Sequence, residues 1–165
     1  EGKEIDLSQI DSEIIFEWSN LECPYVKRHY SSNNMQTTQK FAKSKNVIWI
    51  TVISSAEGKQ GYIQPDDAVN TFASFGSFPD HILVDENGDL GKKFNAKTTP
   101  HIFIANKDKD IVYQGAIDDA GGTKFWTTDL DQSTNFVKKV VNDIKSSKPV
   151  SVSKTRPYGC SVKYG

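Results

Sequence analysis

The chain has 165 residues, the length of a single domain, of which 36% are hydrophobic and 25% are charged. Its 20 lysine and arginine residues nearly balance 21 aspartate and glutamate residues, so the net charge is −1. This balance argues against a nucleic-acid-binding protein and against a polybasic membrane anchor. The longest apolar run, Val47–Ile53, is too short to cross a bilayer, which needs about 20 residues.

The first half of the chain alternates predicted strands and helices. Strands are predicted over residues 13–18 and 46–54, and helices over residues 25–44 and 65–76. The second strand is almost continuously β-branched and aromatic, which is typical of a strand buried on both faces. Pro24 suits the first turn of the first helix, whereas the polar segment Ser31–Asn34 predicts a kink or break within it.

The second half continues the pattern. We expect a strand and turn over residues 81–88, one or two helical turns over 88–96, a hairpin over 100–118 and a helix over 135–148. The last helix has a clear apolar face, formed by Phe136, Val137, Val140, Val141 and Ile144. Residues 149–165 are rich in proline, glycine and serine and predict an extended arm.

The order of elements predicts an α/β fold with a mixed central sheet flanked by helices. Parallel pairs come from the alternating strands and helices, and the hairpin adds antiparallel pairing. We therefore expect one domain over residues 1–148, followed by a C-terminal tail over 149–165. Trp18, Trp49 and Trp126 are interpreted as core or packing residues.

Four segments resemble one redox family: FEWSNLECPYV from Phe16, FNAKTTPHIFI from Phe94, VYQGAIDD from Val112 and GCSVKY from Gly159. They are similar to the thioredoxin-fold redoxins, and in particular to the peroxiredoxin-like, alkyl hydroperoxide reductase and thiol-specific antioxidant group. The resemblance implies a cysteine after the first core strand and a cis-proline facing it. It departs from the dithiol members at Val26, which stands where a Cys-x-x-Cys motif has its second cysteine.

The two cysteines are the candidate catalytic residues. Cys23 would be the nucleophile, because the N-terminus of a helix favours the thiolate form of a cysteine. Two interpretations pair Cys160 with Cys23, as its resolving thiol or in a permanent disulfide, and the alternative is two unpaired thiols. A static bridge closing so long a loop would stabilise the fold by about 5 kcal/mol. Both interpretations require the tail to return to Cys23.

The resemblance also implies a substrate-binding surface around Cys23. Its expected members are Asn20, Pro24, Thr99 and Pro100. The backbone before a cis-proline is free to pair with an extended substrate. Asn20 is a candidate to orient the thiolate, and His101 is expected to be a strand residue rather than a base.

We therefore expect a thiol oxidoreductase, peroxiredoxin-like, that needs no cofactor or metal and takes electrons from a thiol reductant. Its partners would be a disulfide-bearing protein or a peroxide, and it would act as a monomer or homodimer. The first residue, Glu1, and the polar tail favour a periplasmic or secreted protein, with the cytoplasm as the alternative. Two rival hypotheses are a binding domain with a structural disulfide and a copper chaperone that uses cysteines with His29, His81 or His101.

Overall fold

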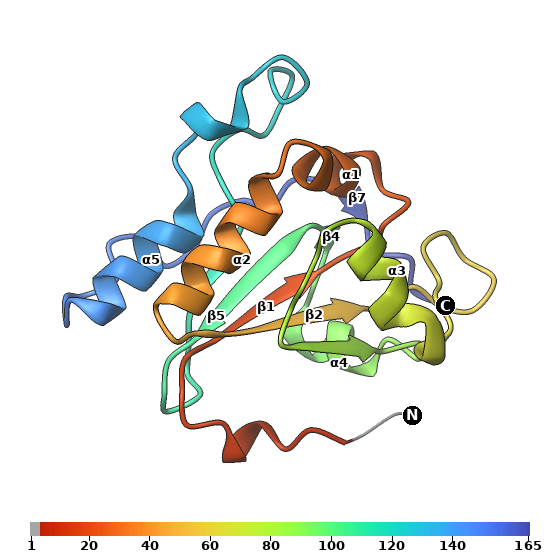
Figure 1. Cartoon of the computed structure of the whole chain (residues 1–165), viewed down its shortest axis with the longest axis horizontal. Coiled ribbons are helices and arrows are strands. Elements are labelled where there is room, and N and C mark those ends of the chain that lie inside the picture. Colours follow the sequence, from red (N-terminus) through yellow and green to blue (C-terminus); the bar gives the residue numbers. More distant parts are fainter. Residues whose placement is uncertain (1–3) are drawn as a thin grey trace.

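A computed structural model describes residues 4–165, and its centre is a five-stranded mixed sheet in the order β3-β2-β1-β5-β6 (Figure 1). The strands of this sheet are β1 (Ile14–Trp18), β2 (Ile48–Ile53), β3 (His81–Val84), β5 (His101–Ala105) and β6 (Ile111–Gly115). Strands β1, β2 and β3 are parallel, whereas β5 pairs antiparallel with both β1 and β6. The predicted α/β class, the interior position of β2 and the hairpin are confirmed.

A second, very small sheet joins β4 (Thr98–Thr99) to β7 (Cys160–Ser161). The helices are α1 (Pro24–Ser31), α2 (Asn34–Ser44), α3 (Ala68–Ser74), α4 (Asp89–Phe94) and α5 (Phe136–Lys145), with 3-10 turns at Leu7–Gln9, Pro65–Asp67 and Leu130–Gln132. The predicted break in the first helix is confirmed, because Asn33 separates α1 from α2 with a φ of 64°. Asparagine adopts this left-handed conformation more readily than most residues.

The two faces of the sheet are covered differently. One face carries Ile15 and Trp49 and packs against apolar residues of α1, α2, α3 and α5. The opposite face carries Phe16 and Trp18 and packs against Phe94 of α4 and the segment before β1. Alternate side chains of β1 thus enter separate cores, as the two-residue period of a strand requires.

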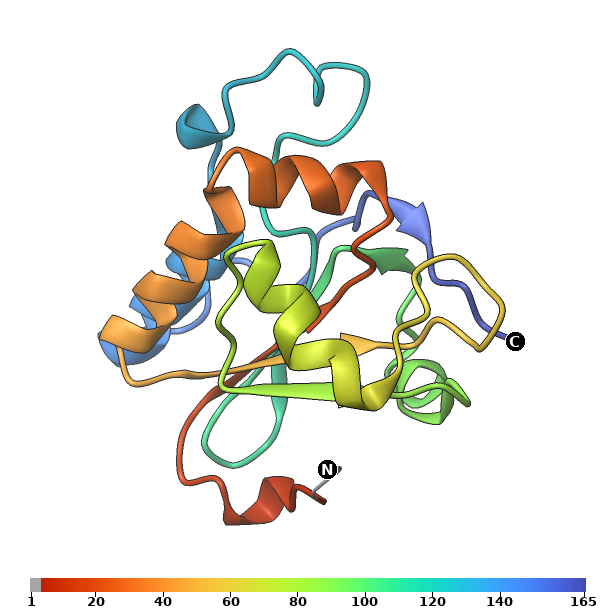
Figure 2. The ribbon, with the colours of Figure 1, turned by 45° about the vertical axis from the view of Figure 1, so that its right-hand side comes forward.

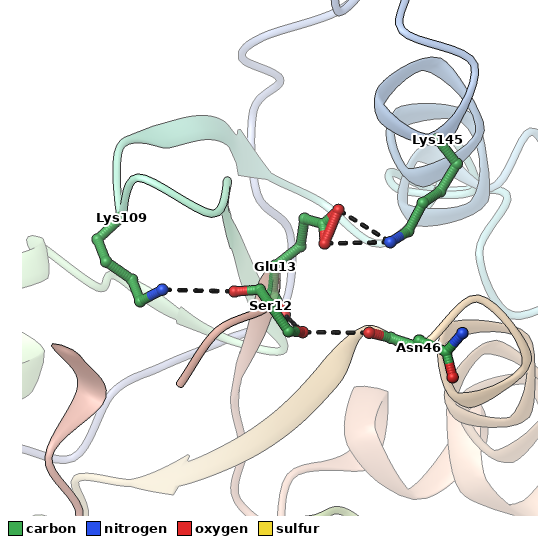
Figure 3. A network of polar contacts seen from close by, with 5 residues as sticks. All are labelled: Ser12, Glu13, Asn46, Lys109 and Lys145. Atoms are coloured by element: carbon green, nitrogen blue, oxygen red, sulfur yellow. Dashed lines mark hydrogen bonds and ion pairs between the residues drawn. The ribbon is translucent and has the colours of Figure 1, made fainter. Parts of the chain in front are cut away.

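A polar network connects neighbouring elements at the end of the sheet where β1 begins (Figure 3). Lys145 of α5 forms an ion pair of 2.9 Å with Glu13, and Lys109 in the hairpin turn donates to the carbonyl of Ser12 over 3.5 Å. The Ser12 hydroxyl donates to the carbonyl of Asn46 over 3.1 Å. These contacts fix the start of β1 to α5, to the hairpin and to the turn before β2.

The extended tail, residues 149–165, packs onto the fold. Val150 and Val152 pack against the helix-covered core, and Val162 packs against the opposite one. The Thr155 hydroxyl accepts from the amide of Ala116 over 2.9 Å, and Tyr164 donates to the carbonyl of Ala96 over 2.7 Å. The tail therefore returns to the sheet, as both interpretations of Cys160 require.

The interpretation of the three tryptophans as core or packing residues is confirmed, with two in the core and one in a packing contact near the surface. Trp18 and Trp49 are buried, but Trp126 is 49% exposed and lies on the long loop between β6 and α5. One side of its ring packs on Tyr25, with centroids 5.0 Å apart. None of the helices described within residues 4–165 is long and apolar enough to cross a membrane.

A buried carboxyl group lies in the helix-covered core. Glu17 of β1 is fully buried and accepts hydrogen bonds from Tyr30 (2.9 Å), Trp49 (3.0 Å) and Thr51 (3.1 Å). Burial raises the pKa of Glu17 to about 7, and the hydrogen bonds oppose that shift without cancelling it. This group therefore titrates near neutral pH.

We predict that the Glu17→Gln variant loses part of the pH dependence of stability. Between its unfolded pKa of 4.5 and its folded pKa of about 7, folded Glu17 binds a proton that the unfolded chain has released. The free energy of unfolding therefore falls as pH rises through this window, by about 3 kcal/mol from this group. Urea denaturation at a series of pH values should show a flatter profile for Glu17→Gln.

Glu13→Gln is the matched control for this experiment. Burial opposes the shift, but the ion pair with Lys145 lowers the pKa of Glu13 overall, so the stabilisation from this group is lost as pH falls below that window. The control should keep the decline between about pH 5 and 7. An unchanged decline in Glu17→Gln would contradict the assignment.

Candidate active site

Cys23 stands at the junction between the central strand and the first helix. The strand β1 ends at Trp18, and Cys23 is the residue that precedes α1, with Pro24 at the first helical position. The amide of Cys23 donates to the carbonyl of Asn20 over 3.0 Å, which closes a tight turn. Cys23 therefore lies at a helix N-terminus, where unpaired amides favour a negative charge.

The Thr99–Pro100 segment before β5 lies directly against Cys23. The thiol of Cys23 donates to the carbonyl of Thr99 over 3.3 Å, and the Thr99–Pro100 peptide bond is cis. Strand register explains this proximity, because Trp18 at the end of β1 pairs with His101 at the start of β5. The expected cis-proline facing the cysteine is thus present in the structure.

The second cysteine reaches the same place from the other end of the chain. Cys160 pairs with Thr99 between β7 and β4, and Figures 1 and 2 both show these two strands side by side near the start of α1. Both cysteines are free thiols. Burial and the neighbouring Cys23 raise the pKa of Cys160 to about 11, whereas Lys163 partly opposes the shift. Cys160 is therefore protonated at neutral pH.

The loop before Cys23 is fastened to the loop after β2. Asn20 accepts from the amide of Glu22 over 2.9 Å and donates to the side chain of Gln60 over 3.3 Å. The carboxylate of Glu22 accepts from the amide of Gly61, where a Cβ would lie 2.2 Å from the Asn20 side chain. The hydrogen bonds of the Asn20 side chain thus go to the loops, whereas its expected role was to orient the thiolate.

A second polar network anchors the tail beside α1. His29 accepts from Asn34 at Nδ1 (2.9 Å), so its Nε2 carries the proton and donates to the hydroxyl of Tyr158 (3.1 Å). Tyr158 in turn donates to the carboxylate of Asp118. Burial, reinforced by Arg28, lowers the pKa of His29 to about 3, so the ring is neutral. Burial raises the pKa of Asp118.

Aromatic rings surround this network. Phe125 is fully buried and packs against Tyr25, His29 and Tyr158, with ring centroids 4.9 to 5.4 Å apart. Arg28 lies over the ring of Phe125 at 5.0 Å and donates to the carbonyl of Thr128 over 2.7 Å. The long loop between β6 and α5 is thereby held against α1 (Figure 1).

Two clefts flank the pair of cysteines. One, of about 580 Å³, is lined by Leu21, Glu22 and Lys27 together with the loop at Gly61. The other, of about 600 Å³, is lined by Tyr25, Thr98 and Asp118 together with the tail at Tyr158 and Gly159. Cys23 lines neither cleft and has no exposed surface, but its neighbours in sequence Glu22 and Tyr25 line the first and the second cleft, respectively.

The sequence predicted part of this site. Cys23, Thr99, Pro100 and Cys160 come together, whereas the network of Tyr158 was missed. The only available signal for the network was a tyrosine two residues before Cys160. His101 is a buried strand residue whose Nδ1 accepts from the amide of Lys97 over 3.1 Å.

The histidines considered for copper do not converge. They lie in α1, β3 and β5, respectively. Within residues 4–165, no group of three or more histidine, cysteine, aspartate or glutamate side chains is arranged to hold a metal ion. Burial, together with Lys97, lowers the pKa of His101 to about 4.

The fold and the match to a family model place the chain among the thiol oxidoreductases with a thioredoxin-like fold. The Redoxin family model matches residues 1–141, and the chain therefore belongs to the Redoxin family. The matched region contains Cys23 and Pro100 and ends before Cys160.

Solved structures share the fold at low sequence identity. A hypothetical protein from Sinorhizobium meliloti 1021 superposes with a TM-score of 0.76 and 18% identity, covering 94% of this chain and 81% of that one. An uncharacterized conserved protein from Geobacillus kaustophilus gives 0.72 and 20%, covering 94% and 78%. A thioredoxin-like protein from Aeropyrum pernix gives 0.53 and 22%, covering 69% and 75%. No curated protein matches the sequence.

We predict that Asn20→Ala destabilises the loop before Cys23. The change removes the acceptor for the Glu22 amide and the donor to Gln60, which should lower the free energy of unfolding by about 1–3 kcal/mol. Urea denaturation measures this loss. Asn106→Ala, which removes one exposed hydrogen bond in the hairpin turn, should cost less. Equal losses of stability in the two variants would contradict the role of Asn20 in fastening the loop before Cys23.

Proposed function

We propose that this protein is a thiol-disulfide oxidoreductase in which Cys23 is the nucleophile and Cys160 is the resolving thiol. One observation carries the proposal: Cys160 pairs with Thr99, whose carbonyl accepts the thiol hydrogen of Cys23. Thr99 thus contacts both cysteines, which come from distant parts of the chain and are both reduced. Such an arrangement suits a cysteine pair that cycles between thiols and a disulfide.

The reaction with a disulfide would have two steps. The thiolate of Cys23 attacks one sulfur of the substrate, forming a mixed disulfide and releasing the other sulfur as a thiolate. Cys160, after losing its proton, then attacks the Cys23 sulfur, which forms the Cys23–Cys160 disulfide and releases the second substrate thiolate. The substrate is reduced by two electrons and the protein is oxidised by two. An external thiol reductant restores both cysteines.

The pKa of Cys160 depends on the state of Cys23, and this dependence favours attack by Cys23 before attack by Cys160. Part of the rise in the pKa of Cys160 comes from the neighbouring Cys23. That contribution disappears once the Cys23 sulfur is bound in a mixed disulfide, because the sulfur then carries no ionisable proton. Cys160 therefore becomes a better nucleophile at the stage when it is needed.

The predicted substrate-binding residues border this reaction. Pro24 is exposed at the start of α1, and Asn20 holds the loop beside it. Thr99 is 2% exposed, and among the described residues its hydroxyl has no hydrogen-bond partner. A buried hydroxyl without a partner is costly, so a substrate that bonds to Thr99 would gain from it. Pro100 would shape the surface next to Thr99.

A peroxide is the alternative substrate. In that case the Cys23 thiolate attacks one oxygen, forming a sulfenic acid and releasing an alkoxide or hydroxide that takes up a proton. Cys160 then condenses with the sulfenic acid, which yields the same disulfide and water.

The competing proposal, a binding domain with a structural disulfide, is favoured by the complete burial of Cys23. A periplasmic or secreted location, and action as a monomer or homodimer, remain predictions.

Intact-mass analysis of cysteine variants tests the proposal. Fully reduced protein treated with oxidised glutathione, or separately with hydrogen peroxide, should lose two hydrogens at Cys23 and Cys160. Cys160→Ser should instead accumulate a glutathione adduct, or a sulfenic acid, on Cys23. Cys23→Ser should abolish thiol-dependent turnover. Undiminished turnover in Cys23→Ser would end the proposal, and a bridge that resists mild thiol reductants would favour a structural disulfide.

A further inference from the structure

The proposed nucleophile is covered although its neighbours are exposed. Glu22 and Pro24 lie on the surface, whereas Cys23 between them has no exposed surface. The atoms against Cys23 include the carbonyl of Thr99 and the side chain of Cys160. A segment of the tail thus contributes to the burial of Cys23.

This segment occupies the edge of a strand. Cys160 and Ser161 pair antiparallel with Thr99 and Thr98, and the amide of Val162 donates to the carbonyl of Lys97 over 3.1 Å. Within the described chain, β7 is the only strand that pairs with β4. Removing the tail would leave the backbone groups of β4 open to another extended segment.

Gly159 makes the close approach possible. Its φ is +147°, and a Cβ at this position would lie 2.1 Å from the carbonyl oxygen of Thr99. Any other residue would therefore force β7 away from β4 or distort the backbone. The close position of the tail against β4 thus depends on one glycine directly before Cys160.

Tyr158 fastens the tail on the other side of Gly159. Its hydroxyl joins Asp118 and His29, and its ring packs against Phe125 at 5.3 Å. Beyond β7, the carbonyl of Lys163 accepts from the amide of Ala56 over 2.9 Å. The short strand is therefore held at both ends, while β7 itself contributes only two residues.

We propose that Gly159–Ser161 is a built-in strand that gates Cys23, so that the tail must leave β4 before a protein partner reaches the nucleophile. The proposal concerns the regulation of the proposed catalytic site and rests on that function. The partner segment that fits the vacated edge is extended and carries a cysteine preceded by glycine, since the tail itself satisfies this geometry. The oxygen of Thr99 excludes a larger residue at that position.

Alkylation of Cys23 in the full chain tests the gate without relying on activity. In a Cys160→Ser background only Cys23 reacts with iodoacetamide, and intact mass follows the reaction. Adding Gly159→Ala should accelerate alkylation about tenfold, because reactivity follows the population of the open state. Tyr158→Phe, which keeps the ring and loses the hydroxyl contacts, should accelerate it to a smaller extent.

Gly58→Ala is the matched control. Gly58 also has a positive φ, +78°, but a Cβ there would meet no atom within 4 Å. This variant also introduces an alanine at a positive φ, but away from β4, so alkylation of Cys23 should stay unchanged. Circular dichroism verifies that each variant is folded. Equal alkylation rates in the folded Tyr158→Phe variant, the Gly58→Ala variant and their Cys160→Ser parent would overturn the gate.

A peptide probe tests which extended segment the edge of β4 accepts. The probe has the sequence RPYGCSVKYG, with its cysteine carried as a mixed disulfide with thionitrobenzoate. The Cys23 thiolate of the Cys160→Ser chain attacks the peptide sulfur, and thionitrobenzoate leaves as a coloured thiolate. A peptide with alanine before the cysteine should react about tenfold more slowly, because its Cβ would meet Thr99.

The two proposals fail in different ways. Equal rates for the two peptides would overturn the inferred preference for glycine. If neither peptide reacts even with the Tyr158→Phe variant, whose Cys23 iodoacetamide alkylates faster, the gate stands and disulfide exchange between Cys23 and such a peptide is excluded. If alkylation shows no gating but Cys23 and Cys160 still form a disulfide with oxidised glutathione, the proposed function stands without the gate.

Discussion

The backbone pairing of Thr99 with Cys160 is the contact on which the site depends. Strand β1 ends beside the start of β5, so the Thr99–Pro100 segment that leads into β5 lies against Cys23, at the end of the loop that follows β1. Cys23 and Thr99 are therefore neighbours because of the sheet itself. Cys160 joins them only because the tail adds a strand to Thr99. Without that pairing, the second thiol would have no fixed position near the first.

Buried polar groups stabilise this arrangement and make it specific. A buried polar group costs free energy unless it has partners, so a satisfied network favours one arrangement of the chain over others. Glu17 connects β1 to α1 and β2 in this way, and the Tyr158 hydroxyl connects the tail to α1 and to the segment after β6. The tail thus belongs to the same cooperative structure as the sheet.

Local patterns predicted most of the elements, whereas the surroundings of particular residues escaped them. The β-branched run at residues 46–54 and the polar break at Ser31–Asn34 have local physical causes, and both predictions were correct. The sequence left open whether Trp126 is a core or a packing residue, because hydrophobicity does not reveal whether a loop residue faces the core or solvent. The tail was predicted as an extended arm, but its composition did not show where it packs, because proline, glycine and serine also occur where a chain packs closely against a backbone, as Gly159 does.

The sequence by itself determined the local features of the site: a strand ending before Cys23, a helix starting at Pro24, and a proline after Thr99. Each of these depends on residues adjacent in the chain. Only the tertiary structure decided that Cys23 is buried, that Cys160 lies beside it, and that Gly159 sets the distance of the tail. The reason is physical, since these properties depend on atoms far apart in sequence, as in the hydrogen bond from Cys23 to Thr99, whose partners are 76 positions apart. Backbone pairing and packing bring such atoms together, and no local pattern specifies them.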